Sequence, residues 1–146
     1  MHNVVVIVDL DRFKKIIKEM GWPEYSPNTI TGLMSELVDD LARKHHAMII
    51  YGLDWRRGTE EAILACSSPN MDALLNDLEA IRRKVEDAGR ETRSKATISI
   101  GVAQGPLLKF KPTASRKELF KTLTERLAKR ALQKAKRLGG NRIIVL

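Results

Sequence analysis

The stretch VVVIVDLDRFKK, residues 4–15, decides the fold that we expect for this chain. Its first five residues form a continuous apolar, β-branched run, which is typical of a strand buried on both faces. A strand of that kind lies in the middle of a sheet. The run ends at Asp9 and Asp11, so the sequence predicts two carboxylates at the end of a central strand.

Outward from this strand, the sequence alternates between helical and extended patterns. Apolar residues that recur every three or four positions predict helices over residues 12–20, 30–45, 71–88 and 115–138. Apolar runs between Gly, Pro and polar breaks predict further strands over residues 47–51, 61–66, 97–103 and 143–146. The order predicts an α/β (α+β) domain, a ferredoxin-like βαββαβ palm with an extra helix, a C-terminal strand and a mainly antiparallel central sheet.

Polar residues at the starts of the helical segments supply the acceptors that a helix N-terminus needs. Asn28 or Thr29 precedes the second helix, and Asn70 precedes the third. Ser115 and Glu118 have the spacing of a capping box before the last helix, and Gly139-Gly140 ends it.

Composition and length are those of one globular domain over residues 1–146. The single Cys66 has no partner for an internal disulfide, which fits a reducing compartment. The apolar run at residues 4–8 is too short for a signal peptide or a membrane span, so we expect a cytoplasmic protein. The net charge of +8 favours an anionic partner, and charge alone does not separate nucleic acid, membrane surface and polyphosphate.

Two carboxylates in this order of elements have the arrangement of a metal site. Asp9 ends the central strand, and Asp54 lies in the tip of the hairpin predicted around residues 52–60. Hard cations such as Mg²⁺ take one or two carboxylates and leave positions for phosphate oxygens. The structural alternative is that both acids only end a strand or form a turn.

Three segments resemble the GGDEF domains. The opening stretch matches their Asp-x-Asp-x-Phe-Lys pattern, TISIGVA at residues 97–103 resembles their penultimate strand, and AKRALQKAKRLGGNRIIV at residues 128–145 resembles their closing motif. The three segments occur in the family's order, and IIYG at residues 49–52 extends the likeness. The resemblance reaches the palm of CRISPR polymerases, and the chain length is most similar to that of the minimal, stand-alone ones.

The resemblance implies a nucleotidyl cyclase. In that family a 3′-hydroxyl attacks an α-phosphate, nucleoside triphosphates condense to a cyclic di- or oligonucleotide, and pyrophosphate leaves. It also implies a two-metal site with Mg²⁺ or Mn²⁺, a homodimer that brings two triphosphates together, and a downstream effector protein that reads the product. The likeness to CRISPR polymerases implies a role in antiviral defence.

The family's metal ligands carry over to the two ends of this site. Asp9 matches the carboxylate ligand and Leu10 offers a backbone carbonyl. The hairpin reads YGLDWRRGTEE at residues 51–61, longer than the family's signature turn. Counting from the incoming strand places the second ligand at Asp54, which we prefer, whereas counting back from residues 62–64 places it at Glu60.

Nucleotide-binding residues are implied at both ends of the chain. Lys136 matches the triphosphate-binding Lys of the closing motif. The family's following Arg falls on Gly140, so Arg137 or Arg142 would have to replace it.

The opening motif adds Asp11, Phe13 and Lys14 as nucleotide-binding residues. The family's two guanine-reading positions fall on Ile17 and Ser26. An apolar side chain cannot satisfy the hydrogen-bonding groups of guanine, so we expect ATP to be favoured over GTP.

A second class of function is a catalytically degenerate palm domain that binds nucleotide or RNA without turnover. This alternative would use the sheet and the basic last helix. RNA-binding sheets of this shape carry stacking aromatic residues, and residues 97–103 contain none. The sequence therefore favours the enzyme.

Overall fold

The computed structural model describes residues 2–106 and 123–146. The predicted order of strands and helices is confirmed over these residues. The elements are β1 (His2–Leu10), α1 (Phe13–Met20), α2 (Thr29–Lys44), β2 (Met48–Tyr51), β3 (Glu61–Ser67), α3 (Met71–Glu91), β4 (Ile98–Pro106), α5 (Leu123–Arg137) and β5 (Ile143–Val145).

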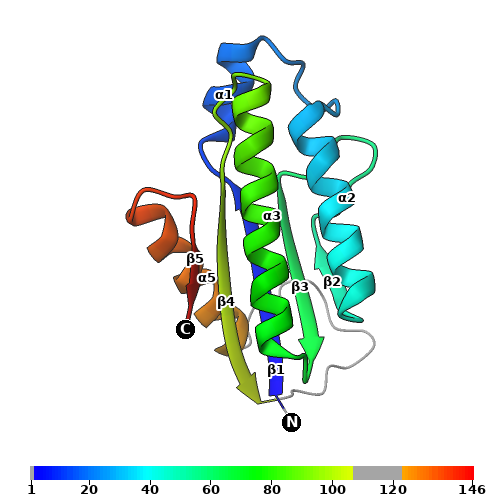
Figure 1. Ribbon diagram of the computed structural model, residues 1–146, viewed down its shortest axis with the longest axis vertical. Helices are drawn as coiled ribbons and strands as arrows, with labels where there is room; N and C mark the ends of the chain where they lie inside the picture. The colour runs from blue at the N-terminus through cyan, green and yellow to red at the C-terminus, as the bar shows by residue number, and fades with distance from the viewer. Residues whose placement is uncertain (1, 107–122) are drawn as a thin grey trace.

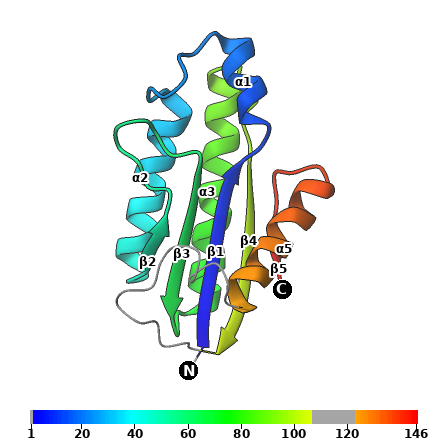
Figure 2. The ribbon, with the colours of Figure 1, turned by 180° about the vertical axis from the view of Figure 1, so that it is seen from behind.

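The sheet has the order β2-β3-β1-β4-β5, with β1 at its centre. Strand β1 is antiparallel to β3 and to β4, β2 is antiparallel to β3, and β5 is parallel to β4. The mainly antiparallel palm is therefore confirmed. Helices α2 and α3 lie side by side over one face of the sheet (Figure 1), and the view from behind shows the strands in front of them (Figure 2).

The side chains of β1 alternate between two hydrophobic cores. The even-numbered residues from Val4 to Leu10 pack with α2 and α3, whereas Val5 and Ile7 pack with Ala128 and Leu132 of α5. This explains the unbroken apolar run at the start of the sequence. Because successive side chains point to opposite faces, Asp9 falls on the side of α5.

Helix α5 approaches the sheet closely because small residues meet at the contact. A Cβ atom at Gly101 would lie 2.3 Å from Ala128 O and 2.5 Å from Leu132 N. Ala128, Ala131 and Ala135 are fully buried on the facing side of the helix. The close approach fixes the helix that carries Lys136 against the strands.

The helix ends follow the sequence with one difference. The Asn28 side chain accepts hydrogen bonds from Ile30 N and Thr31 N, and the Asn70 side chain accepts one from Ala73 N, as expected. Helix α3 does not end before Gly89 but continues to Glu91.

Helix α3 continues past Gly89 because this glycine allows close packing against Ala96 and does not turn the chain. A Cβ atom there would lie 2.3 Å from Ala96 O. Gly139 and Gly140 have positive φ and end α5 as predicted. The expected capping box at Ser115 and Glu118 lies outside the described residues. Among the described helices, none is long and apolar enough to cross a membrane.

Two glycine substitutions test the packing of α5. Gly101→Ala is expected to lower the free energy of unfolding by about 1–3 kcal/mol, because its methyl group overlaps the backbone of α5. Gly32→Ala, in α2, places its methyl group where nothing lies within 4 Å, and should instead raise stability by about 0.5–1 kcal/mol. Urea unfolding measures both. Similar effects of the two substitutions on the free energy of unfolding would contradict the close approach of α5 to the sheet.

Candidate functional site

The Lys136 ammonium lies among oxygens from the end of β1. Its Nζ lies 3.2 Å from Asp9 Oδ2 and 2.8 Å from Asp11 Oδ1. It also donates to Asp9 O at 3.3 Å and to Leu10 O at 3.1 Å. The structure thus brings together Asp9, Leu10, Asp11 and Lys136, which the sequence motifs placed in one site.

Asp11 is a buried anchor and does not face a ligand. Only 5% of it is exposed, and its carboxylate accepts hydrogen bonds from Thr97 Oγ1, Ser99 Oγ, Lys136 Nζ and Asn141 N at 2.7–2.9 Å. Burial alone would raise the pKa of Asp11, but these hydrogen bonds together hold it below its usual value. In the structure Asp11 therefore positions Lys136, and its assignment as a nucleotide-binding residue stays a prediction.

Gly140 lies directly against this anchor. A Cβ atom at Gly140 would lie 2.7 Å from Asp11 Oδ2, so no larger residue fits here without displacing the carboxylate. The GGDEF resemblance expects an Arg at this position. Arg142 folds back, its Nε donating to Gly140 O at 3.0 Å, whereas Arg137 is exposed at the end of α5. Both stay sequence-predicted replacements for that Arg.

Asn141 connects the site to α3, a role that the motif did not reveal. Arg82 Nη1 donates to Asn141 Oδ1 at 2.9 Å, and Asn141 Nδ2 donates to Glu86 Oε2. Asn141 adopts φ 53°, a left-handed conformation that Asn tolerates better than most residues. The closing motif's Asn therefore holds the loop after α5 to both Asp11 and α3.

Asp9 is half-buried beside this cluster. Burial raises the pKa of Asp9 from 3.8 to about 6; Lys136 opposes the rise, and Glu61 and Asp11 add to it. A raised carboxyl pKa next to like charges is typical of sites that bind a further cation.

Glu61, the first residue of β3, lies directly across the ladder from Asp9. Leu10 N donates to Glu60 O at 3.0 Å, which fixes this register. Residues paired across an antiparallel ladder point to the same face, so Glu61 shares the face of Asp9. The sequence interpretation missed Glu61, because its only signal was its place beside Glu60.

Asp54 is not brought to Asp9 but forms its own turn. Its Oδ1 accepts hydrogen bonds from Arg56 N and Arg57 N, each at 2.9 Å. These backbone hydrogen bonds hold the pKa of Asp54 below its usual value. Asp54 therefore stays a sequence prediction for the second metal ligand, and Glu60 and Glu61, at the outgoing end of the hairpin, are the carboxylates that we carry to the proposal.

The hairpin tip is docked on α2 by buried polar groups. Ser35 Oγ donates to Asp54 O at 3.1 Å and lies 2.7 Å from Thr59 Oγ1. Thr59 N donates to Thr31 O at 3.1 Å. Gly58, at φ 88°, leaves the space that this contact with Thr31 needs. The tip therefore has a fixed position, which sets where β3 begins.

A cleft of about 1220 Å³ lies between α1, the segment from α1 to α2, and the hairpin tip. Among the predicted residues it is lined by Lys14, Ile17, Asp54 and Glu60. Its other lining residues are Lys18, Gly21, Trp22, Pro23, Glu24, Tyr25, Ser26, Asn28, Thr31, Tyr51, Gly52, Leu53, Arg57, Gly58 and Glu61. The volume is sufficient for a nucleotide.

Phe13 does not line this cleft. Only 5% of it is exposed, and its ring packs against Trp22 with centroids 6.3 Å apart. Its assignment as a nucleotide-binding residue stays a prediction; in the structure Phe13 supports Trp22, which lines the cleft.

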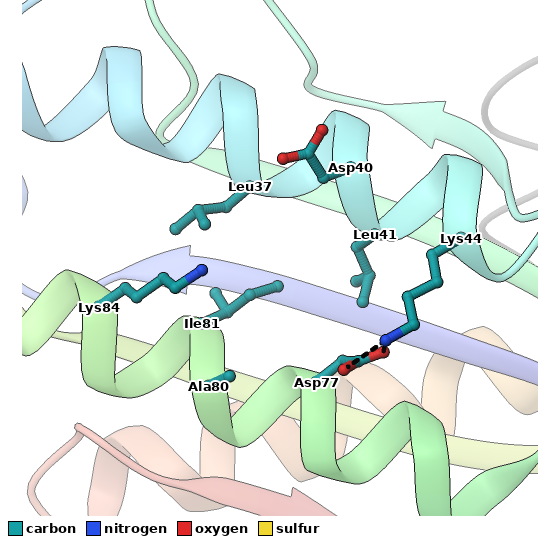
Figure 3. Close-up of a pocket in the computed structure, with 8 residues that line it drawn as sticks. All are labelled: Leu37, Asp40, Leu41, Lys44, Asp77, Ala80, Ile81 and Lys84. Carbon is teal, nitrogen blue, oxygen red and sulfur yellow. Dashed lines mark hydrogen bonds and ion pairs between the residues drawn. The ribbon is translucent and has the colours of Figure 1, made fainter.

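A smaller hollow of about 180 Å³ lies between α2 and α3 (Figure 3). It contains the ion pair of Lys44 Nζ with Asp77 Oδ2 at 2.9 Å, and Asp77 Oδ2 also lies 2.7 Å from His45 Nε2. None of the sequence-predicted site residues lines it, so we place the functional site at the large cleft and the end of β1.

The donors present fit a divalent cation of the Mg²⁺ type. Asp9 and Glu61 supply carboxylates on one face, and Leu10 supplies a carbonyl oxygen that already accepts a hydrogen bond from the Lys136 ammonium. In residues 2–106 and 123–146, no group of three or more His, Cys, Asp or Glu side chains is arranged to hold a metal. Mg²⁺ is commonly bound by one or two carboxylates, with water and substrate phosphates completing its shell.

Comparison with known proteins identifies the fold. No family model matches the sequence, and no curated protein is significantly similar to it. The GGEEF domain of a diguanylate cyclase from Vibrio cholerae superposes with a TM-score of 0.69 at 19% identity, over 99% of this chain and 83% of that one. The GGDEF domain of DgcB from Caulobacter crescentus, solved with c-di-GMP, gives 0.67 at 22% identity, over 99% and 77%.

A third structure is that of a larger assembly. The Csm1–Csm4 cassette in complex with cA4 superposes with a TM-score of 0.50 at 16% identity, over 99% of this chain and 21% of that one. This chain thus corresponds to about a fifth of that protein. The structure confirms what the three sequence motifs predict: the chain has the fold shared by GGDEF diguanylate cyclase domains and the CRISPR polymerase Csm1.

Proposed function

We propose that this protein is a metal-dependent nucleotidyltransferase that condenses nucleoside triphosphates into a cyclic di- or oligonucleotide and releases pyrophosphate. One observation carries the proposal: Asp9, Glu61 and Lys136 meet at one end of the sheet, on the fold that nucleotide cyclases use. Glu61 also lines the cleft of about 1220 Å³, so the charged cluster and the space for a nucleotide adjoin.

The end of β1 supplies the metal-binding groups in this proposal. Asp9, the Leu10 carbonyl and Glu61 would hold Mg²⁺ or Mn²⁺, with Glu60 beside them as the alternative carboxylate. Two bound ions would lower the pKa of the attacking hydroxyl and neutralise the charge that develops on the phosphate and the leaving group.

Lys136 binds the triphosphate in this proposal. Its ammonium is close to Asp9 already, and an anionic substrate would draw it from Asp9 toward the phosphates while it keeps its hydrogen bond to Asp11. Arg137 and Arg142, which lie near it in the chain, and Lys14, which lines the cleft, would add positive charge for the phosphates. The 3′-oxygen of one nucleotide bonds to the α-phosphorus of the other, the bond to pyrophosphate breaks, and the hydroxyl proton leaves to solvent.

The proposal favours adenine as the base. Ile17, at one of the two guanine-reading positions, lines the cleft beside Trp22 and Pro23. These apolar side chains leave the hydrogen-bonding groups of guanine unsatisfied, whereas stacking is available to any base. We therefore place ATP ahead of GTP.

The wider role follows from the chemistry of the product. Condensing two triphosphates calls for two nucleotide sites in proximity, so we propose a homodimer. A cyclic nucleotide acts by binding a separate effector protein, and the likeness to a cassette that holds cA4 supports a signal used in antiviral defence.

A palm domain that binds nucleotide or RNA without turnover is the competing candidate. Within the part of the chain that the structure describes, no cluster of three metal-binding side chains forms. This observation favours a domain that binds nucleotide or RNA without turnover. The two candidates differ in one observable, the release of pyrophosphate.

Product analysis tests the proposal directly. The protein is incubated with each triphosphate and Mg²⁺ or Mn²⁺, and mass spectrometry should find a cyclic product with ATP. Asp9→Asn and Glu61→Gln should each reduce turnover at least about 100-fold, because each removes a metal-binding carboxylate. Asp54→Asn, whose side chain only forms a turn, should keep most of the activity.

Glu60→Gln completes this series, because it separates the two adjacent carboxylates. A larger loss for Glu60→Gln than for Glu61→Gln would move the second ligand by one residue. Loss of activity in Asp54→Asn, with activity retained in Glu60→Gln and Glu61→Gln, would contradict a metal site formed by Asp9 and either glutamate. No product from any triphosphate would favour the degenerate palm.

The charge of Asp9 should destabilise the metal-free fold. Its pKa of about 6 in the fold exceeds the value of 3.8 expected for the unfolded chain, so the unfolded state loses its proton first as pH rises. Asp9→Asn should therefore raise the free energy of unfolding by about 1–3 kcal/mol above pH 6 and have little effect below pH 4.

Denaturant unfolding at pH 8 and at pH 4, without metal, measures this difference. Glu36→Gln on the exposed side of α2 is the control and should show no comparable pH dependence. Destabilisation by Asp9→Asn at pH 8 would contradict the unfavourable environment of the carboxylate.

A further inference from the structure

The outer face of α5 carries a row of exposed cations. Arg126, Lys129, Arg130 and Lys134 are all exposed, and we refer to these four residues as the α5 stripe. The helix contains one acidic residue, Glu125, which is buried. The stripe therefore has no exposed acidic neighbour on its own helix.

Helix α3 of the same chain shows the usual arrangement. Its cations alternate with acids at helical spacing, as in the pairs of Glu79 with Arg82 at 2.6 Å and with Arg83 at 3.2 Å. By contrast, no ion pair between described residues involves any member of the α5 stripe. A merely solvated helix face would gain from the α3 pattern, and α5 lacks it.

The spacing within the stripe is unfavourable to the helix itself. Arg126 and Arg130 are four residues apart, as are Arg130 and Lys134, so like charges lie side by side. Each such pair destabilises a helix, and a bound polyanion removes that repulsion. The arrangement is the one expected where the charges act on an anionic partner outside the chain.

The helix presents these charges on a rigid support. Its inner face is packed closely on the sheet through Ala128 and Leu132, and Lys136 ties its last turn to β1. The stripe extends over about 12 Å of helix, at 1.5 Å per residue, a length that several consecutive phosphates of one strand can span. The charges form a fixed line that matches a linear polyanion.

We propose that the α5 stripe binds the phosphodiester backbone of a nucleic acid, independently of base sequence. Residues 123–137 contain no aromatic side chain that could stack on a base, so the contacts would be to phosphates. Helices that lie on membranes also present an apolar face for insertion, whereas the apolar residues of α5 are buried or half-buried except for Leu123 at its start. Nucleic acid therefore fits this face better than an anionic bilayer.

Fluorescence anisotropy with a labelled 20-nucleotide RNA tests this proposal. Binding to the full chain is measured from 50 to 300 mM salt, with the single strand and with a duplex of the same sequence. Neutralising four phosphates of a single strand gives a slope of log K against log salt of about −3. The two RNA forms show which one the stripe prefers, and tight binding of either supports the proposal.

A charge-matched pair of variants locates the contact. Arg130→Glu with Lys134→Glu should weaken binding at least about tenfold at 150 mM salt and reduce the slope by about half. Lys84→Glu with Lys95→Glu, at exposed positions in α3 and the turn before β4, changes the net charge equally and should weaken binding less than about threefold. Circular dichroism verifies that both variants are folded.

Three outcomes would overturn the proposal. Equal loss of affinity in the two variants would mean that binding follows net charge and not the α5 stripe. Absence of RNA binding by the unmodified protein at 150 mM salt would remove the partner. Binding to phosphatidylserine vesicles without binding to RNA would assign the stripe to a membrane surface.

Discussion

The contact of the Lys136 ammonium with the buried Asp11 carboxylate is the interaction on which the rest of this structure depends. It joins the first strand of the chain to its last helix. Because Asp11 is buried and fully hydrogen-bonded, removing Lys136 would leave an uncompensated charge in the interior, at a cost of about 3–5 kcal/mol. Site geometry and fold stability therefore share one ion cluster.

The packing around this cluster explains the local sequence. Gly101 and the facing alanines let α5 lie close enough for Lys136 to reach β1, and Gly140 leaves room for the Asp11 carboxylate. Asn141 then holds the following loop to Asp11 and to α3. The glycines and the Asn of the closing motif together hold the Lys136 ammonium in its position.

The sequence predicted the fold well because its signals are local. Apolar periodicity located each described element, and the unbroken run before Asp9 identified a central strand. Asp9 and Lys136 were found through their motifs. Glu61 was missed because its relation to Asp9 depends on strand register, which residue patterns do not define when the hairpin tip has an unusual length. The sequence also does not reveal that the Asp54 side chain binds the backbone of its own turn.

The proposed function depends on a cation site at the end of β1, which a metal and a triphosphate would occupy together. Anomalous X-ray diffraction from crystals grown with Mn²⁺ and a non-hydrolysable ATP analogue tests this most directly. We predict a manganese peak within coordination distance of an Asp9 carboxylate oxygen and the Leu10 carbonyl, with the Lys136 ammonium moved onto the phosphates. A manganese peak at Asp54 would contradict the proposed site. So would a bound analogue with the Lys136 ammonium still on Asp9 and no manganese beside Asp9.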